Sequence, residues 1–320
     1  MTVQTLSVVV PVYNEVESLD RFVTELMETL QADSMAAYQS KVFLVDDGST
    51  DGSVELERQL QKTWDGQLEV IELSRNFGKS AALRAGFDYS DSELVVTFDA
   101  DGQDVPAELP RLLAALDEQG VDLMCGWRQT RIDRSVKRRT SKIYNWVTRK
   151  GSGLDLHDFN TGLKLLTREL VDALPLYGEF HRYVPVLAYD LGFRVGEIAV
   201  EHRPRTAGVS KYMSLSRFPK TFLDLFTVLF LTKFSNSPMY LFGGLGVALG
   251  GLGFVILSWL TFVKLVLGEG IGQRPLLMFG MLLTLVGLQL FMTGLLGDAL
   301  RLSQASSRPT YRVRSSTLKA

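Results

Sequence analysis

The sequence of 320 residues predicts an α/β domain with a parallel sheet, followed by interfacial helices and two membrane-spanning helices. Three observations support this fold class. Short apolar runs alternate with amphipathic helical patterns through the first 126 residues. Clusters of acidic residues directly follow several of these runs. Two long segments without any charged residue lie near the C-terminal end.

Five apolar runs in the first part of the chain are predicted strands. In chain order they are Leu6–Val10, Lys41–Val45, Leu68–Leu73, Leu94–Phe98 and a weaker run, Asp122–Gly126. The helical patterns between them cover Leu19–Leu30, Ser53–Lys62, Lys79–Tyr89 and Ala107–Gln119. Strands that are covered on both faces by crossover helices have continuous apolar runs, so this alternation favours a parallel sheet. Residues 127–212 are less regular.

Two segments near the C-terminal end are long enough to cross a membrane. Met239–Val263 contains 25 residues without a charge, and Pro275–Gly297 contains 23. About 20 apolar residues in a helix cross the hydrocarbon core of a bilayer. A buried core helix is the alternative for either segment, but two such runs in succession favour two membrane spans.

The segment before the first span has an amphipathic pattern. Within Leu215–Lys233, apolar residues recur at helical spacing and basic residues lie opposite them. Such a helix fits the membrane interface. Packing of the same apolar face on the core of the N-terminal domain is an open alternative.

Basic residues flank the pair of spans, whereas the connecting loop offers only Lys264 and Arg274. The flanking set is Lys211, Arg217, Lys220 and Lys233 before the first span, and Arg301, Arg308, Arg312, Arg314 and Lys319 after the second. Because basic loops remain in the cytoplasm, we expect both termini and the N-terminal domain on that side of a multi-pass protein. No signal peptide is expected, since the chain opens on a strand-like run.

Charge and cysteine content narrow the class of protein further. The formal net charge is −2, which gives no basic field for nucleic acid. Cys125 is the one cysteine of the sequence, so an intrachain disulfide is excluded and a reducing compartment is favoured.

Polar clusters stand where three of the predicted strands end. They are Tyr13-Asn14-Glu15, Asp46-Asp47-Gly48-Ser49 and Asp99-Ala100-Asp101-Gly102-Gln103. In open α/β sheets, ligands bind outside the carboxyl ends of the strands. Asp99 and Asp101 offer two hard oxygen ligands of the kind that Mg²⁺ or Mn²⁺ needs beside a diphosphate, and Gln103 could add a third.

Other ligand motifs fit this sequence poorly. An EF-hand is excluded because Pro110 occupies the twelfth position of the loop that starts at Asp99. Gly78-Lys79-Ser80 resembles the end of a phosphate-binding loop, but Leu73 stands where its first glycine is required. No G-x-G-x-x-G follows a predicted strand, so a dinucleotide site is also unsupported.

Together the clusters resemble the motifs of the polyprenyl-phosphate glycosyltransferases, members of glycosyltransferase family 2 that are related to dolichol-phosphate mannose synthase. The four matching segments are Pro11–Glu15, Asp46–Ser49 with Asp51-Gly52, Asp99–Gln103 and Gly208–Tyr212. Their order and spacing match over about 210 residues. The two spans are similar to those of bacterial members of the undecaprenyl-phosphate glucosyltransferase type.

The resemblance implies a Rossmann-like catalytic domain of the GT-A type over residues 1–212. It further implies amphipathic juxtamembrane helices over 213–237, two transmembrane helices over 238–298 and a cytoplasmic tail over 299–320. The protein would lie in the inner (plasma) membrane of the cell.

The resemblance also implies roles for individual residues. The nucleotide-sugar contacts would be Pro11, Tyr13, Asn14, Glu15, Asp46, Asp47, Asp99, Ala100 and Asp101. The metal ligands would be Asp99, Asp101 and Gln103. The catalytic and phosphate-binding set would be Arg128, Arg139, Asp158, Arg205 and Lys211. Asp158 is either a base or a residue that orients substrate, and Lys164 stands where the family frequently has Arg.

The implied reaction is an inverting transfer of a sugar from a nucleotide-sugar to a polyisoprenyl phosphate such as undecaprenyl phosphate. The product would be a lipid-phosphate-sugar donor for glycosylation of the cell envelope. UDP-glucose is the preferred donor, with GDP-mannose or a UDP-aminosugar as alternatives. A polysaccharide synthase-like transferase with a saccharide acceptor is the other alternative, but those enzymes carry a Gln-x-x-Arg-Trp motif and more spans.

Glycines recur on one face of each predicted span. The second span has Gly280, Gly287 and Gly294 at intervals of seven residues, and the first has Gly246 and Gly250. Small residues let helices approach closely in lipid. They predict a homo-oligomer, for example a tetramer, although packing of the two spans within one chain is an equal alternative.

Overall fold

The computed structural model describes residues 3–129, 148–150, 152–204, 237–272 and 274–304. The chain divides into two compact units, residues 1–228 and 229–320, and each is described by itself. The predicted juxtamembrane helices before residue 237 and the tail after residue 304 lie outside the described residues.

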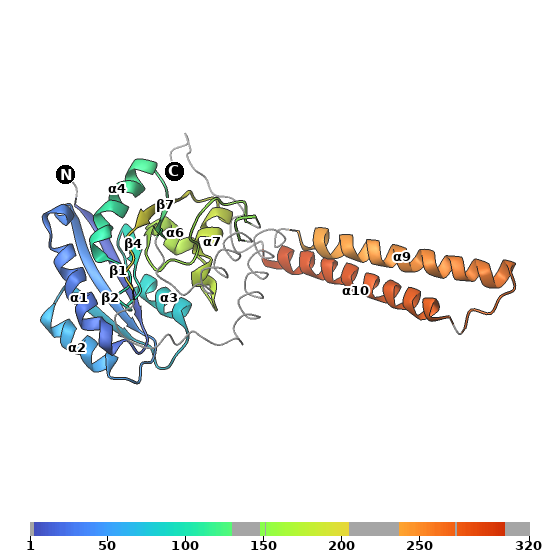
Figure 1. Cartoon of the computed structure of the whole chain (residues 1–320), viewed down its shortest axis with the longest axis horizontal. Coiled ribbons are helices and arrows are strands. Elements are labelled where there is room, and N and C mark those ends of the chain that lie inside the picture. Colours follow the sequence, from blue (N-terminus) through green and yellow to red (C-terminus); the bar gives the residue numbers. More distant parts are fainter. Residues whose placement is uncertain (1–2, 130–147, 151, 205–236, 273, 305–320) are drawn as a thin grey trace. The chain divides into compact units, whose positions relative to one another are not determined.

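The first unit is built on a seven-stranded sheet with the order β3-β2-β1-β4-β6-β5-β7 (Figure 1). The strands are β1 (Gln4–Val12), β2 (Tyr38–Asp46), β3 (Leu68–Glu72), β4 (Leu94–Thr97), β5 (Leu123–Arg128), β6 (Lys164–Thr167) and β7 (Val195–Val200). Strand β6 is antiparallel to both of its neighbours, and the other pairs are parallel. The predicted α/β fold is confirmed, and the predicted parallel sheet is corrected at β6, which makes the sheet mixed.

Helices cover both faces of this sheet. They are α1 (Val16–Leu30), α2 (Ser53–Thr63), α3 (Lys79–Tyr89), α4 (Leu109–Gln119), α6 (Arg168–Ala173) and α7 (Val184–Asp190), with short 3₁₀ turns η1 (Asp33–Met35), η2 (Pro106–Glu108) and η3 (Phe180–Arg182). Val8 and Val10 of β1 belong to one core cluster with side chains of α1 and α4. Val9 points the other way, where Gly86 lets α3 pack directly against the strand. Burial on both faces explains the continuous apolar run of β1.

Strands β6 and β7 fall in the part of the chain whose pattern is less regular. β6 has only four residues and begins with a lysine, and β7 is half-buried along most of its length. Neither has the long apolar run that marks β1 and β2. Pairing of Thr97 with Lys164 places the start of β6 beside the carboxyl end of β4.

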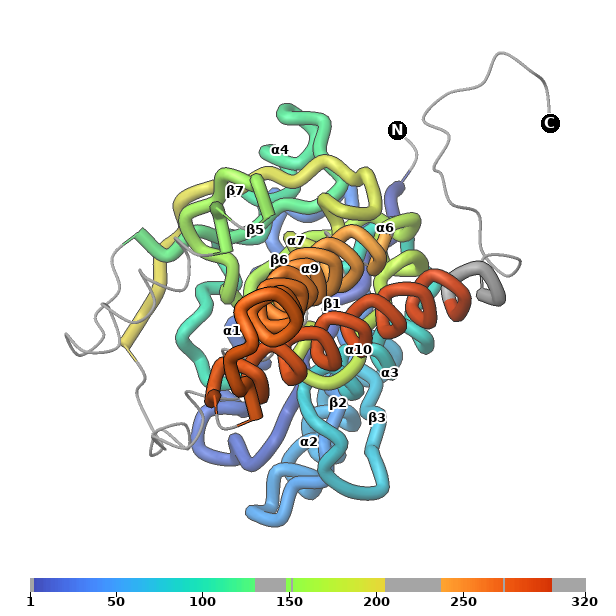
Figure 2. The backbone as a smooth tube through the Cα atoms, turned by 90° about the vertical axis from the view of Figure 1, so that its right-hand side faces the viewer, coloured from blue at the N-terminus to red at the C-terminus, as the bar shows by residue number. Residues whose placement is uncertain are grey.

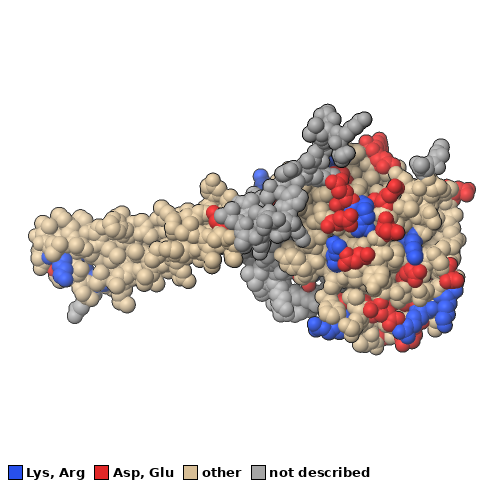
Figure 3. Space-filling view, turned by 180° about the vertical axis from the view of Figure 1, so that it is seen from behind, with Lys and Arg blue, Asp and Glu red and all other residues tan. Residues whose placement is uncertain are grey.

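The second unit is a hairpin of two long helices, α9 (Pro238–Val266) and α10 (Pro275–Gln304), which lie side by side (Figure 2). Both are long and apolar enough to span a membrane, with a mean hydropathy of 2.0. Only 17% of the most apolar segment of α9 and 11% of that of α10 are buried within the structure. Figure 3 shows one face of the α9–α10 hairpin. This face is uncharged along most of the hairpin, and basic residues lie at the end where the loop joins the two helices.

The glycines of the two helices face each other within one chain. A Cβ added at Gly287 would lie 2.5 Å from Cα of Gly250 and 2.7 Å from the carbonyl oxygen of Gly246. A Cβ added at Gly253 would lie 2.7 Å from the carbonyl oxygen of Gly280. These glycines therefore serve packing of the hairpin, the alternative that the sequence left open. The homo-oligomer stays a prediction without support from this glycine face.

Candidate active site

Two turns at the carboxyl edge of the sheet are joined by the side chains of the first two motifs. Asn14 adopts a left-handed backbone conformation with φ of 54°, and its Oδ1 accepts a hydrogen bond from the Thr50 amide at 2.7 Å. The Asn14 amide donates to Oγ of Ser49 at 2.9 Å, and the Glu15 amide donates to Oγ of Ser53 at 3.1 Å. Asn14, a predicted nucleotide contact, thus shapes the edge on which a nucleotide would lie.

The paired acids of the second motif hold neighbouring loops. Oδ1 of Asp46 accepts the amides of Gly48 and Ser49, both at 2.8 Å, and this side chain is buried. Asp47 accepts the Phe77 amide on Oδ1 at 2.7 Å and the Gly78 amide on Oδ2 at 2.9 Å. Burial raises the pKa of Asp47 in spite of these bonds.

The remaining predicted nucleotide contacts flank these turns. Pro11 lies within β1, paired with Val45, and is half-buried. The Tyr13 side chain is 39% exposed at the end of β1, where a ligand can reach it. Oε2 of Glu15 accepts a bond from the Ser18 hydroxyl at 3.3 Å.

The third motif forms a turn after β4 that is anchored at several points. The Ala100 carbonyl accepts the Ser18 hydroxyl at 3.0 Å, and Oδ1 of Asp101 accepts the Gln103 amide at 3.1 Å. The Gln103 side-chain amide donates to the Arg203 carbonyl at 3.2 Å, and the Arg203 amide donates to the Gln103 carbonyl at 2.9 Å. The side-chain oxygen of Gln103 is the atom that would serve as the predicted metal contact.

Asp104 is a further acid of this turn that the sequence analysis missed. It is buried, and its Oδ2 lies 3.4 Å from the Asp99 amide nitrogen. Burial, followed by the charge of Asp99, raises the pKa of Asp104 to about 7. Both carboxylates lie against Gly162, where an added Cβ would come within 2.6 Å of Oδ2 of Asp99 and 2.7 Å of Oδ2 of Asp104. The spacing D-x-D-x-x-D was the available sequence signal.

Lys79 at the start of α3 forms an ion pair with Asp99. Burial alone would raise the pKa of Asp99, but the adjacent ammonium outweighs burial and lowers the pKa to about 2. Lys164 and Arg128 act in the same direction. The sequence indicated Lys79 only as part of Gly78-Lys79-Ser80, which does not fit a phosphate-binding loop.

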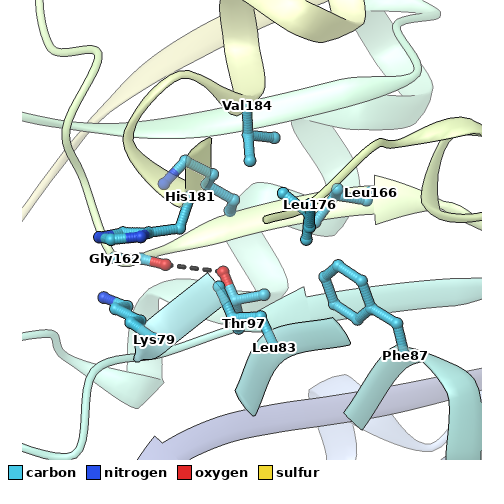
Figure 4. Close-up of a pocket in the computed structure, with 10 residues that line it drawn as sticks. Lys79, Leu83, Phe87, Thr97, Gly162, Leu166, Leu176, His181 and Val184 are labelled. Carbon is cyan, nitrogen blue, oxygen red and sulfur yellow. Dashed lines mark hydrogen bonds between the residues drawn. The ribbon is translucent and has the colours of Figure 1, made fainter. Parts of the chain in front are cut away.

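A small cavity lies behind this ion pair (Figure 4). Lys79, Gly162 and His181 line one end, and Phe87 and Leu176 line the other. The cavity has room for about one water molecule and is too small for a substrate. It is therefore a packing gap beside the site.

Two basic side chains line this cavity, His181, which is half-buried, and Lys164, which is buried. Nδ1 of His181 lies 3.0 Å from Oγ of Ser80, and burial, followed by the charge of Lys79, lowers the pKa of His181 to about 2. Its imidazole is therefore neutral. Lys164 donates to the Thr161 carbonyl, and burial lowers its pKa to about 8. Lys164 therefore lies inside the fold, where its charge acts on Asp99. Too little of its side chain is exposed to contact an acceptor phosphate.

Arg128 and Asp158, two members of the predicted catalytic set, are brought together. Nε of Arg128 donates to Oδ2 of Asp158 at 2.7 Å, and Nη2 donates to Oδ1 at 3.2 Å. Nη2 also donates to the Asn160 carbonyl at 2.7 Å. The exposed fractions of the two side chains are 13% and 4%. Arg139, Arg205 and Lys211, the other members, lie outside the described residues.

The arrangement suits a divalent cation that arrives with a phosphorylated ligand. Among the described residues, no group of three His, Cys, Asp or Glu side chains is gathered as a complete metal site. Mg²⁺ is commonly held by one or two carboxylates, with substrate phosphates and water as the other ligands. Asp99 and Asp101 fit this pattern, and the ammonium at Asp99 shows that this carboxylate accepts a cation.

Comparison with known proteins agrees with this geometry. The profile of Glycosyl transferase family 2 matches residues 7–174, more than half of the chain. Dodecaprenyl-phosphate galacturonate synthase of Rhizobium johnstonii is 37% identical, covering 97% of this chain and 92% of that protein. Undecaprenyl-phosphate 4-deoxy-4-formamido-L-arabinose transferase of Aeromonas hydrophila is 34% identical, covering 97% and 93%.

Solved structures share the fold at lower identity. Glucosyl-3-phosphoglycerate synthase of Mycobacterium tuberculosis, solved with Mn²⁺, UDP-glucose and glycerol 3-phosphate, has a TM-score of 0.51 at 20% identity and covers 72% of this chain and 80% of its own. A mannosyltransferase of Pyrobaculum calidifontis, solved with GDP-mannose and Mn²⁺, has a TM-score of 0.50 at 17% identity, with 95% and 76% covered. The chain therefore belongs to glycosyl transferase family 2, among the polyprenyl-phosphate sugar transferases.

Proposed function

We propose that this enzyme transfers a sugar from a nucleoside diphosphate to the phosphate group of a polyprenyl phosphate. The observation that carries the proposal is a turn with Asp99 and Asp101 at the carboxyl edge of the sheet, in a chain that also has the apolar hairpin α9–α10. The polyprenyl-phosphate sugar transferases match both parts, since they cover almost the whole chain.

Asp99 and Asp101, with Gln103, would hold a Mg²⁺ or Mn²⁺ ion. Such an ion would neutralise the charge that builds on the departing diphosphate. The two structural neighbours above were solved with Mn²⁺ and a nucleotide-sugar, which supports a divalent cation in this fold. When the cation binds Asp99, the Lys79 ammonium would move from this carboxylate to the incoming phosphates.

The acceptor needs positioning more than deprotonation. A phosphate monoester has a second pKa of about 6, so it is mostly an anion at pH 7 and can attack without a base. We therefore assign Asp158 an orienting role, because it is held by Arg128 in a bidentate ion pair. Arg128, Arg139, Arg205 and Lys211 would supply the positive charge that holds acceptor and diphosphate together. A single displacement then inverts the anomeric centre.

The identity of the sugar is proposed from the relatives. The family resemblance alone favoured glucose, but the relatives described above are named for galacturonate and 4-deoxy-4-formamido-L-arabinose. We place a UDP-linked galacturonate or 4-deoxy-4-formamido-L-arabinose donor ahead of UDP-glucose and GDP-mannose. The hairpin would keep the enzyme in the inner membrane, with the catalytic domain and both termini in the cytoplasm.

The test is a donor panel with the purified full chain in detergent, Mn²⁺ and undecaprenyl phosphate. We expect a mass spectrum to show one lipid-phosphate-sugar, its loss in EDTA, and its return with Mg²⁺ or Mn²⁺. Asp101→Asn should lose at least about 10²-fold in rate, the size of a preorganised electrostatic contact. Asp20→Asn, an exposed acid of α1, serves as the matched control. Transfer to a saccharide and not to the lipid would instead identify a polysaccharide synthase-like enzyme.

A further inference from the structure

Glu57 is a buried acid of α2 that the reaction described above does not use. Its side chain is fully enclosed, and neither carboxyl oxygen has a hydrogen-bond partner among the described residues. Oδ2 of Asp46 is likewise buried without a partner there, although Oδ1 of the same group accepts two amides. Buried carboxyl oxygens without a partner are costly, and the cost is smaller when one of the two acids keeps its proton.

The charged groups around Glu57 are mostly acidic. Asp46 ends β2, Asp51 lies in the loop before α2, and Glu72 ends β3. Arg58 is a nearby cation, but it is paired with Glu72 through two hydrogen bonds of 2.7 Å. Burial, followed by the charge of Asp46, raises the pKa of Glu57 to about 8. Two ionised carboxylates at this place would repel each other in a poorly solvated interior.

We propose that Glu57 keeps its proton in the folded enzyme and donates it to Oδ2 of Asp46. The shared proton fixes Asp46, whose other oxygen accepts the amides of Gly48 and Ser49 and so shapes the turn that borders the donor site. Glu57 is then a positioning residue for the nucleotide-sugar. This role rests on the proposed function, whereas the protonation of Glu57 does not.

Two substitutions separate this role from simple filling of space. Glu57→Gln keeps a side-chain N–H that can donate to Asp46, so we expect it to retain the wild-type KM for the nucleotide-sugar. Glu57→Met fills a similar volume on the buried face of α2 but cannot donate. It should raise this KM about tenfold, the order of one hydrogen bond to a charged group, with little change in kcat.

The pH dependence of stability tests the proton directly. The pKa of Glu57 in the folded protein lies above the ordinary carboxyl value of 4.5. The stability that this proton provides is therefore complete below about pH 4.5 and is lost progressively as the pH rises from there to about 8. Thermal unfolding of the full chain in detergent between pH 5 and 9 should show wild type losing stability relative to Glu57→Gln as the pH rises to about 8, with the difference levelling off above that pH.

The outcomes distinguish the inference from the proposed function. Parallel stability profiles for wild type and Glu57→Gln would overturn the shared proton. A wild-type KM in folded Glu57→Met would overturn the positioning role. Failure of the wild type to bind UDP, measured by calorimetry with Mn²⁺ present, would reject the proposed donor site. The protonation of Glu57 would then be tested by the stability measurement alone.

Discussion

At the scale of single residues, the ammonium of Lys79 stands where a metal cation would bind. It forms an ion pair with Asp99, whose pKa it lowers below the ordinary range. Asp104 lies beside Asp99, and its burial, followed by the negative charge of Asp99, raises the pKa of Asp104. A metal ion and Lys79 must therefore compete for the Asp99 carboxylate whenever no diphosphate is present.

This competition predicts the effect of Lys79→Met on metal binding. Without the ammonium, Asp99 is open to Mn²⁺, so the substitution should tighten Mn²⁺ binding severalfold in the absence of nucleotide. Isothermal titration calorimetry of the full chain in detergent measures the dissociation constant. Lys62→Met, at an exposed position of α2, is the control and should bind as wild type does. Unchanged or weaker binding by Lys79→Met would contradict the competition.

Residue types and spacing predict a candidate site after β4. The acids of the third motif were assigned to a cation because two carboxylates directly after a buried strand are typical of a cation site at the edge of a sheet, and this assignment stays a prediction. Asn14 and Asp47 stay predicted nucleotide contacts, and the structure shows that they also hold turns together, which the sequence did not indicate. Lys79 and Arg128 reach their partners Asp99 and Asp158 through tertiary packing over 20 and 30 residues of sequence, which no local pattern reveals.

At the scale of elements, the apolar runs predicted strands where both faces of the sheet are covered. The predicted helix Lys79–Tyr89 has the bounds of α3, and β1 and β2 extend beyond both ends of the predicted runs. Strand β6 was missed because four residues that begin with a buried lysine carry no periodic signal. Its antiparallel insertion between β4 and β5 depends on long-range pairing alone.

The hairpin α9–α10 gives a prediction at the same scale. Gly287 meets the backbone of Gly246 and Gly250, so Gly287→Leu should push the two helices apart. Gly251 is a matched control, because a Cβ there would meet nothing within 4 Å. We expect Gly287→Leu to lower the thermal unfolding temperature in detergent and Gly251→Leu to leave it unchanged. Equal behaviour of the two variants would show that the helices do not pack at these glycines.

At the scale of the whole molecule, the order of the motifs and the two spans predicted the family over nearly the full chain. The sugar could not be predicted in this way. Motifs report the chemistry that family members share, namely the diphosphate and the metal. Selection among sugars depends on contacts with individual hydroxyl, amino or carboxyl groups, and a single such contact can decide it. The relatives named for galacturonate and formamido-arabinose illustrate how one architecture accepts different sugars.

The last prediction concerns the orientation of the chain in the membrane. Labelling of introduced cysteines can test it, because Cys125 is the one cysteine of the sequence. Cys125 is buried, and burial raises its pKa to about 12, so it should not react with a maleimide. Gly270→Cys places a thiol in the loop between the spans, and Glu17→Cys places one on the exposed face of α1. Because the basic residues flank the hairpin, an impermeant maleimide should label Gly270→Cys in cells whose outer membrane has been made permeable. Glu17→Cys should be labelled only after the inner membrane is opened, and labelling of it before that step would reverse the proposed orientation.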